Sequence, residues 1–137
     1  MKDETEITVR FNEADPLGIV WHGHYIRYFE DGRESFGKKY GLTYLDFHNN
    51  GIVVPIVSVD CSYKKSLRYG ESVIVETNFV YGPAAKLKFN YRIYESKNRD
   101  LVATGSSIQV FVDSKTFDLH LTFPEFFEQW KTKWDIR

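Results

Sequence analysis

A short stretch near the N-terminus, DPLGIVWHGHY, combines an acid, two histidines and several turn-forming residues. It begins at Asp15, seven residues before His22, and ends at Tyr25. Pro and Gly favour turns, and apolar residues at helical spacing follow, so we expect a strand-to-helix junction here. A carboxylate held at such a junction can attack a carbonyl carbon or activate water. The stretch is therefore a candidate site for chemistry at a carbonyl group.

The start of the predicted helix would supply the second half of such a site. Backbone N–H groups at a helix N-terminus lack intrahelical partners and carry partial positive charge. The candidate donors are the amides of His22 and Gly23, which would form an oxyanion hole. Gly23 would let a ligand come close, and Val20 and Trp21 would exclude water. A plain connector would explain the turn residues, but not the apolar run GIVW or an acid without a basic neighbour.

The elements that would hold these groups follow from the hydrophobic periodicity. In EITVRF, the apolar residues Ile7, Val9 and Phe11 alternate with polar ones, which predicts a half-buried strand. Apolar residues at helical spacing then predict one helix from about residue 23 to residue 40. Gly41 follows as the expected left-handed C-terminal cap.

More strands are predicted after the helix, in VVPIVSVDCSYKK, ESVIVETNFVYG, KLKFNYRIYE and LVATGSSIQVFVD. Pro55 indicates an edge or a bulge near the start of the first of them. The short connections YGPAAK and SKNRD indicate consecutive antiparallel neighbours. TFPEFFEQWKTKW predicts a short terminal helix with Pro124 in its first turn. This order predicts an α+β fold in which an antiparallel sheet covers one long helix, leaving surface for self-association.

Size, charge and cysteine content restrict the class of protein. The 137 residues fit one domain, and 18 basic against 19 acidic side chains argue against a nucleic-acid binder. The N-terminus lacks the apolar core of a signal peptide, and no apolar run approaches the ~20 residues that span a bilayer. The single cysteine, Cys61, cannot form an internal disulfide, so we expect a cytoplasmic protein with an inert, buried thiol.

The stretch ADPLGIVWHGHYIRYFEDGRESF resembles the signature of 4-hydroxybenzoyl-CoA thioesterases and the related YbgC-like acyl-CoA thioesterases, which are hotdog-fold proteins. Their pattern, D-x-x-G-x-V-x-(H/Y)-x-x-Y, is filled by Asp15, Gly18, Val20, His22 and Tyr25. The likeness continues in VSVDCSYKKSLRYGESVIVET and GSSIQVFVD and covers about residues 5–115.

The resemblance implies a fold and an activity. Residues 1–137 would form a single hotdog thioesterase domain, a five-stranded antiparallel sheet wrapped around one long helix, with a short C-terminal helix. The activity implied is hydrolysis of an acyl-CoA thioester to the free acid and coenzyme A, without a cofactor. Family members dimerise so that each active site lies between subunits, so a homodimer or homotetramer is expected.

The resemblance also assigns roles to residues of the motif. Asp15 would be the catalytic carboxylate, acting as nucleophile or general base. The backbone N–H of His22, beside Gly23, would polarise the thioester carbonyl. Trp21 and Tyr25 would shape the acyl pocket.

Further binding residues are expected outside the motif. Ser58, on a predicted strand, could line the site from the partner subunit. The phosphates of coenzyme A call for basic residues, and the resemblance points to Lys86 and Lys88. Alternating lysines on a strand can equally be its solvent-exposed face. The basic residues held in reserve are Lys64, Lys65 and Arg68.

Other assignments of the chemical groups remain open. Some hotdog thioesterases use an acid inside the helix, after HGG, which would make Asp31 or Glu30 the essential carboxylate; HGH in this chain counts against that type. His22 and His24 could be metal ligands, but side chains two apart on a helix point about 200° apart. We therefore expect no metal site.

Two other functions also remain open. Hotdog hydratases and dehydratases act on acyl thioesters and pair an Asp with a His five residues later, whereas the spacing here is seven. A non-catalytic acyl-CoA-binding dimer would use the sheet and the terminal segment FFEQWKTKW as a partner surface. Release of a thiol from an acyl-CoA distinguishes the expected hydrolase from both.

Overall fold

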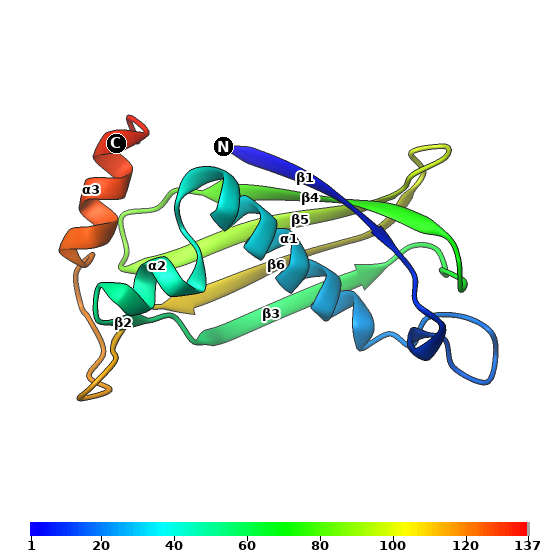
Figure 1. The fold of residues 1–137 in the computed structure, drawn as a ribbon, viewed down its shortest axis with the longest axis horizontal. Helices are drawn as coiled ribbons and strands as arrows, with labels where there is room; N and C mark the ends of the chain where they lie inside the picture. The colour runs from blue at the N-terminus through cyan, green and yellow to red at the C-terminus, as the bar shows by residue number, and fades with distance from the viewer. Residues whose placement is uncertain (137) are drawn as a thin grey trace.

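The computed structural model describes residues 1–136, which form a five-stranded antiparallel sheet wrapped around one long helix (Figure 1). The helix, α1 (His24–Tyr40), lies across one face of the sheet. In spatial order, the strands are β1 (Lys2–Thr8), β4 (Ser72–Val80), β5 (Lys86–Glu95), β6 (Leu101–Val110) and β3 (Ile56–Tyr63). The smaller elements are the 3₁₀-helix η1 (Phe11–Glu13), α2 (Tyr44–Asn49), the paired strands β2 (Ile52–Val53) and β7 (Val112–Asp113), and α3 (Glu125–Lys133).

Helix α1 forms because its apolar residues recur at helical spacing and its C-terminus is capped. Its buried face includes Tyr28, Phe29 and Phe36, none of which has measurable exposure. Gly41 ends the helix in the left-handed region, with φ 78°, and its N–H donates to the carbonyl of Gly37. The helix predicted over about 23–40 is thus confirmed.

Glycine allows α1 to lie close to the sheet. A Cβ atom on Gly105 of β6 would lie closer to the Phe29 ring and to the Asp60 carbonyl oxygen than van der Waals contact allows. Phe29 itself stacks on Tyr91 of β5, with ring centroids 4.5 Å apart. The N-terminus of α1 is therefore fixed relative to the sheet by a tightly packed contact.

The central strands alternate as the sequence predicts, with one face against α1. The buried side chains of β5 are Leu87, Phe89, Tyr91 and Ile93. On β6, Ser106 and Ile108 lie on the outer face of the sheet. Gly105 and Ser107 instead face the helix, since Gly105 contacts Phe29 and Ser107 is fully buried.

The first strand and the region after α1 differ from the sequence prediction. The strand ends at Thr8, and Phe11 begins η1 with its side chain 78% exposed, so its predicted burial is wrong. The chain leaves the sheet there because β1 pairs with β4 only from Lys2 to Thr8. Helix α2 was not predicted. It is only six residues long and begins with a reciprocal cap between Thr43 and Asp46.

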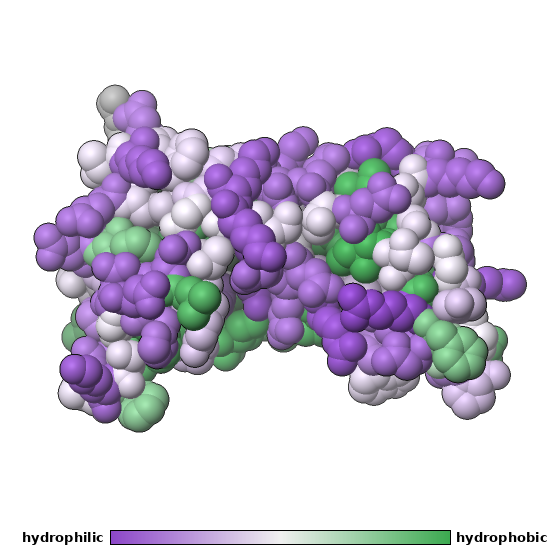
Figure 2. Space-filling view, in the orientation of Figure 1, coloured by the Kyte–Doolittle hydropathy of each residue, from purple (hydrophilic) through white to green (hydrophobic). Residues whose placement is uncertain are grey.

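The two edges of the sheet are β1 and β3. Strand β3 exposes three large apolar side chains, Val57, Val59 and Tyr63, which are 57%, 40% and 48% exposed. Figure 2 shows apolar surface along the lower edge of the molecule, where β3 lies. Within residues 1–136, no helix has both the length and the apolar character needed to cross a membrane.

We predict that Gly105→Ala lowers the free energy of unfolding by about 1–3 kcal/mol, because the new methyl group overpacks the contact with Phe29. Urea unfolding followed by circular dichroism measures the change. Gly82→Ala is the matched control, since a Cβ there meets no atom within 4 Å, and we expect a change below about 0.5 kcal/mol. Equal losses in the two variants would contradict the close-packing account.

Candidate active site

A pocket of about 330 Å³ lies between the N-terminus of α1 and the C-terminal end of β3. Its lining comes from the junction before α1, from the first turn of α1, and from the end of β3 with the residues that follow. The lining residues are Asp15, Ile19, Val20, His22, Tyr25, Tyr63, Lys64, Lys65 and Ser66. The structure therefore brings together Asp15, His22 and Tyr25 of the sequence motif.

Asp15 occupies a closed turn that orients its carboxylate. Its backbone N–H donates to the Ile19 carbonyl (2.8 Å), and its carbonyl accepts from the Gly18 N–H (2.9 Å). Its Oδ1 accepts from the Leu17 N–H at 2.8 Å. Gly18 has φ 82°, which L-residues rarely adopt. The side chain is thus fixed through one carboxylate oxygen and is half-buried beside the pocket.

The junction is also tied to the neighbouring parts of the fold. The Val20 N–H donates to the Leu67 carbonyl at 2.7 Å, in the segment that follows β3. The Trp21 N–H donates to the Glu13 carbonyl at 3.1 Å. These hydrogen bonds hold the two ends of the turn together and attach the turn to the segment after β3. Asp15 and His22 are therefore held in fixed positions relative to each other.

The turn before α1 leaves amide groups free to bind a ligand. The His24 N–H donates to the Trp21 carbonyl at 3.0 Å. The Trp21 carbonyl and the His22 N–H belong to one trans peptide group, so the His22 N–H points away from the Trp21 carbonyl oxygen and from the His24 N–H. Neither the His22 nor the Gly23 amide donates a hydrogen bond to any group within residues 1–136. They are suited to bind a carbonyl oxygen that gains negative charge.

Two tyrosines support this turn. The Tyr63 hydroxyl donates to the His22 carbonyl at 2.9 Å, and its ring meets the Tyr25 ring edge-on at 4.9 Å. Burial raises the pKa of both Tyr25 and Tyr63, so both hydroxyls are protonated at neutral pH. Tyr63 was not predicted from the sequence, because its contact with His22 joins residues 41 positions apart.

Lysine side chains lie at the mouth of the pocket. Lys65 Nζ is 2.5 Å from a Glu95 carboxylate oxygen and 3.5 Å from one of Asp100, and the hydrogen bond to Glu95 raises its pKa. Lys64 has no ion-pair partner in the described part of the chain. Its ammonium group is therefore available to an anionic ligand.

Trp21 and Gly23 lie next to this pocket without lining it. The indole of Trp21 is 51% exposed and packs against the rings of His22 and His24. It also fills the space where a Cβ of Gly23 would lie. In this chain, the space beside Gly23 thus accommodates Trp21, whereas the sequence analysis expected it to admit a ligand.

Ser58, Lys86 and Lys88 are absent from this pocket. Ser58 lies on the face of β3 opposite Tyr63, as strand alternation requires. Lys86 and Lys88 are exposed at the beginning of β5, opposite Val110 and Ile108 of β6, whereas Tyr63 pairs with β6 near its other end. If these residues serve the same site, they must come from a second copy of the chain.

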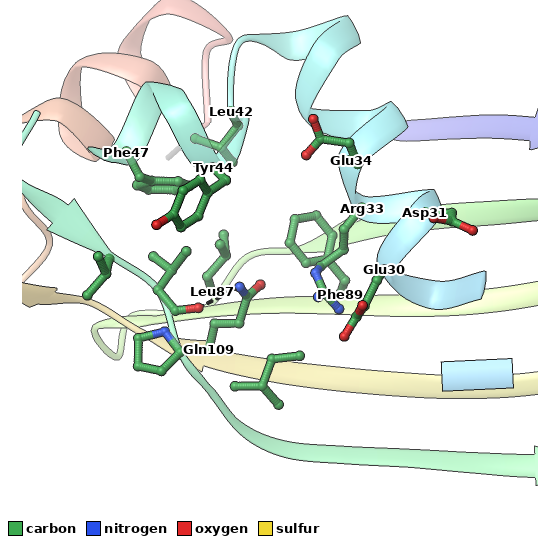
Figure 3. A pocket seen from close by; sticks show the side chains of 14 residues that line it. Glu30, Asp31, Arg33, Glu34, Leu42, Tyr44, Phe47, Leu87, Phe89 and Gln109 are labelled. Atoms are coloured by element: carbon green, nitrogen blue, oxygen red, sulfur yellow. Dashed lines mark hydrogen bonds between the residues drawn. The ribbon is translucent and has the colours of Figure 1, made fainter. Parts of the chain in front are cut away.

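A second pocket of about 570 Å³, mostly apolar but with charged side chains on its α1 side, lies further along α1, between that helix, α2 and the start of β3 (Figure 3). Its walls include Leu42, Phe47, Leu87 and Phe89. Local sequence patterns do not predict this pocket, because its walls come from α2 and from distant strands.

The alternative acids Glu30 and Asp31 lie beside this second pocket and not beside Asp15. Figure 3 shows Asp31 turned away from the cavity. Burial raises the pKa of Asp31. Neither acid lies in the pocket that holds the His22 amide.

Cys61 and the histidines bear no sign of a nucleophilic or metal site in residues 1–136. Cys61 is half-buried on β3, and burial raises the pKa of its thiol, which disfavours the reactive thiolate. No group of three or more His, Cys, Asp or Glu side chains within those residues is arranged to hold a metal ion.

Comparisons with known proteins agree with this fold. Residues 9–131 match the protein family described as the thioesterase-like superfamily. The chain is 34% identical over 130 residues to a putative acyl-CoA thioesterase, YneP, of Bacillus subtilis, covering 95% of this chain and 93% of that protein.

Solved structures give the same picture. A DHNA-CoA thioesterase from Staphylococcus aureus superimposes with a TM-score of 0.87 at 30% identity, covering 98% of this chain and 89% of that one. A 4-hydroxybenzoyl-CoA thioesterase mutant in complex with 4-hydroxybenzoyl-CoA has a TM-score of 0.80 at 22% identity, covering 94% and 97%, and so shares the fold.

We predict that Tyr63→Phe loosens the start of α1. Loss of the hydrogen bond to the His22 carbonyl should lower the free energy of unfolding by about 0.5–1.5 kcal/mol and speed amide exchange at Tyr25 and Ile26. Hydrogen exchange followed by NMR measures both effects. Tyr69→Phe is the control, because the Tyr69 hydroxyl makes no hydrogen bond to the described residues. Unchanged exchange in Tyr63→Phe would rule out this support.

Proposed function

This chain belongs to the thioesterase-like superfamily, and from that membership we propose that it hydrolyses an acyl-CoA thioester to a free acid and coenzyme A. The observation that carries the proposal is the pocket shared by Asp15 and His22. It holds a carboxylate and an unoccupied amide donor, which are the two groups that thioester hydrolysis requires.

In the proposed reaction, the thioester carbonyl oxygen accepts a hydrogen bond from the His22 N–H. As the carbonyl carbon is attacked, its oxygen gains negative charge, and a donor already held in place stabilises that charge without reorganising. The Gly23 amide is a second candidate donor. The hydrogen bond that the His24 N–H donates to the Trp21 carbonyl keeps the His22 amide directed outward from the helix.

Asp15 supplies the basic or nucleophilic half of the reaction. As a general base it removes a proton from water, and the resulting hydroxide attacks the carbonyl carbon. As a nucleophile it forms a mixed anhydride, which water then cleaves. By either route the C–S bond breaks and coenzyme A leaves as a thiol. The oxygen of water ends on the acyl product, or on Asp15 when water attacks the Asp15 side of the anhydride.

We further propose that two chains associate through their β3 edges. An edge strand presents unpaired backbone groups, and on β3 these accompany the exposed Val57, Val59 and Tyr63. A twofold axis would pair the two copies of β3 in antiparallel fashion. The Tyr63 end of one strand would then lie beside the Ile56 end of the other.

That arrangement would join two pockets into one site. The Asp15 pocket borders the Tyr63 end of β3, whereas the larger apolar pocket borders its Ile56 end. In the proposed dimer the acyl group would extend from Asp15 toward the partner's apolar pocket. Ser58, Lys86 and Lys88 project from the sheet face that points away from α1. They would therefore reach a site only from another copy whose outer sheet face packs against it, as in a homotetramer, while Lys64 and Lys65 belong to the same chain as Asp15.

We predict that Asp15→Asn lowers kcat by about 10²-fold or more, because a positioned base or nucleophile contributes at least that much. Thiol release from a panel of short-chain, long-chain and aromatic acyl-CoA substrates measures the effect. Asp118→Asn, in an exposed loop, should leave kcat unchanged. Near-normal turnover by Asp15→Asn, or no thiol release by the wild type, would refute the assignment.

We predict that replacing Lys86 and Lys88 together by Gln raises KM for an acyl-CoA about 10-fold, since each ammonium–phosphate contact contributes affinity. KM for the matching pantetheine thioester, which lacks the nucleotide phosphates, should not change. Lys97→Gln, in the β5–β6 turn, is the control. An equal rise for both substrates would show that these lysines do not bind the phosphates.

Mixing variants tests whether the lysines come from the partner. One kind of chain carries Asp15→Asn, and the other carries both Lys86→Gln and Lys88→Gln. If Asp15 and the lysines of one site come from different chains, mixed oligomers contain sites in which every one of these groups is wild type. Refolding the two variants together should then restore turnover at low substrate. No recovery would place the lysines on the same chain as Asp15, or outside the site.

A further inference from the structure

Glu13 is a buried carboxylate for which the reaction proposed above has no role. Its side chain is only 3% exposed, and no Lys, Arg or His within residues 1–136 forms an ion pair with it. Burying an ionised group without a counter-charge costs several kcal/mol unless hydrogen bonds compensate. The contacts of Glu13 therefore indicate what its burial achieves.

Both hydrogen bonds to the Glu13 side chain are made by the same oxygen atom. Oε1 accepts from the backbone N–H of Arg10 at 2.7 Å and from the hydroxyl of Tyr28 at 3.1 Å. Tyr28 is fully buried in α1, and burial, together with the Glu13 carboxylate, raises its pKa far above neutral pH. Tyr28 thus keeps its proton and donates it, which ties the segment before Asp15 to α1.

The backbone of Glu13 reaches both halves of the proposed site. Its carbonyl accepts from the N–H of Trp21, the residue before His22. Asp15 follows two residues later in the chain, and Ala14 between them bridges to Val20. A shift of Glu13 would therefore move Asp15 and the His22 amide relative to each other.

We propose that Glu13 is a positioning residue that holds the Asp15 carboxylate and the His22 amide at the spacing one thioester carbonyl requires. The role rests on the proposed function, because it concerns the geometry of that site. Glu13 acts through hydrogen bonds at Oε1 and does not touch the substrate. A displacement of about 1 Å can cost on the order of 10²-fold in rate.

The test compares Glu13→Ala with Glu13→Gln. Alanine removes both hydrogen bonds, whereas the amide oxygen of Gln can accept both, because one atom makes them. We expect Glu13→Ala to lower kcat about 10²-fold with KM changed less than about threefold, and Glu13→Gln to recover most of kcat. Glu125→Gln, on the exposed face of α3, should behave as wild type. Rates are normalised to folded protein by circular dichroism.

Unchanged kcat in Glu13→Ala, or no recovery in Glu13→Gln, would overturn the proposal. If Glu13→Ala does not fold, Tyr28→Phe carries the test, since it removes one of the two hydrogen bonds and should lower kcat about tenfold with little change in KM. Failure of the proposed function is seen separately, as absence of thiol release by the wild type. The His22 amide resonance, which should move in Glu13→Ala and return in Glu13→Gln, is read without substrate.

Discussion

The backbone hydrogen bonds that close the junction before α1 are the constraint on which the site depends. Trp21 is bonded back to Glu13, and Asp15 to Ile19, so a carboxylate and an amide seven residues apart in sequence lie in one braced turn. The hydrogen bond from the Val20 N–H to the Leu67 carbonyl attaches that turn to the connection between β3 and β4. Backbone groups close the turn and the buried Glu13 side chain anchors it to Tyr28 of α1, so the amide donors are positioned before a ligand binds.

The rest of the fold serves to keep that junction in place. Close packing of Phe29 against Gly105 and Tyr91 sets the position of α1, and Tyr63 ties the first turn of α1 to the edge strand. The same edge strand exposes apolar side chains that one chain leaves uncovered. The proposed dimer follows from this division: one chain provides the reacting groups, and a second copy provides a pocket for the acyl group.

The sequence predicted what local periodicity and turn chemistry determine. Helix α1, its cap at Gly41 and the alternation of β5 follow from short-range patterns. The prediction failed where tertiary contacts decide, as at Phe11, where the chain leaves the sheet. The role proposed for Asp15 came from the motif. The contacts of Tyr63 with His22 and of Glu13 with Tyr28 could not be predicted, because they join residues that are not neighbours in the chain. Lys64 and Lys65 were ranked behind Lys86 and Lys88, because one sequence does not reveal which end of a sheet borders a pocket.

The most direct test of the central claim is a crystal structure of Asp15→Asn with an intact acyl-CoA bound. The account predicts the thioester carbonyl oxygen within hydrogen-bonding distance of the His22 N–H, with the side chain at position 15 beside the carbonyl carbon. A thioester seated elsewhere, with the His22 amide facing solvent, would contradict it.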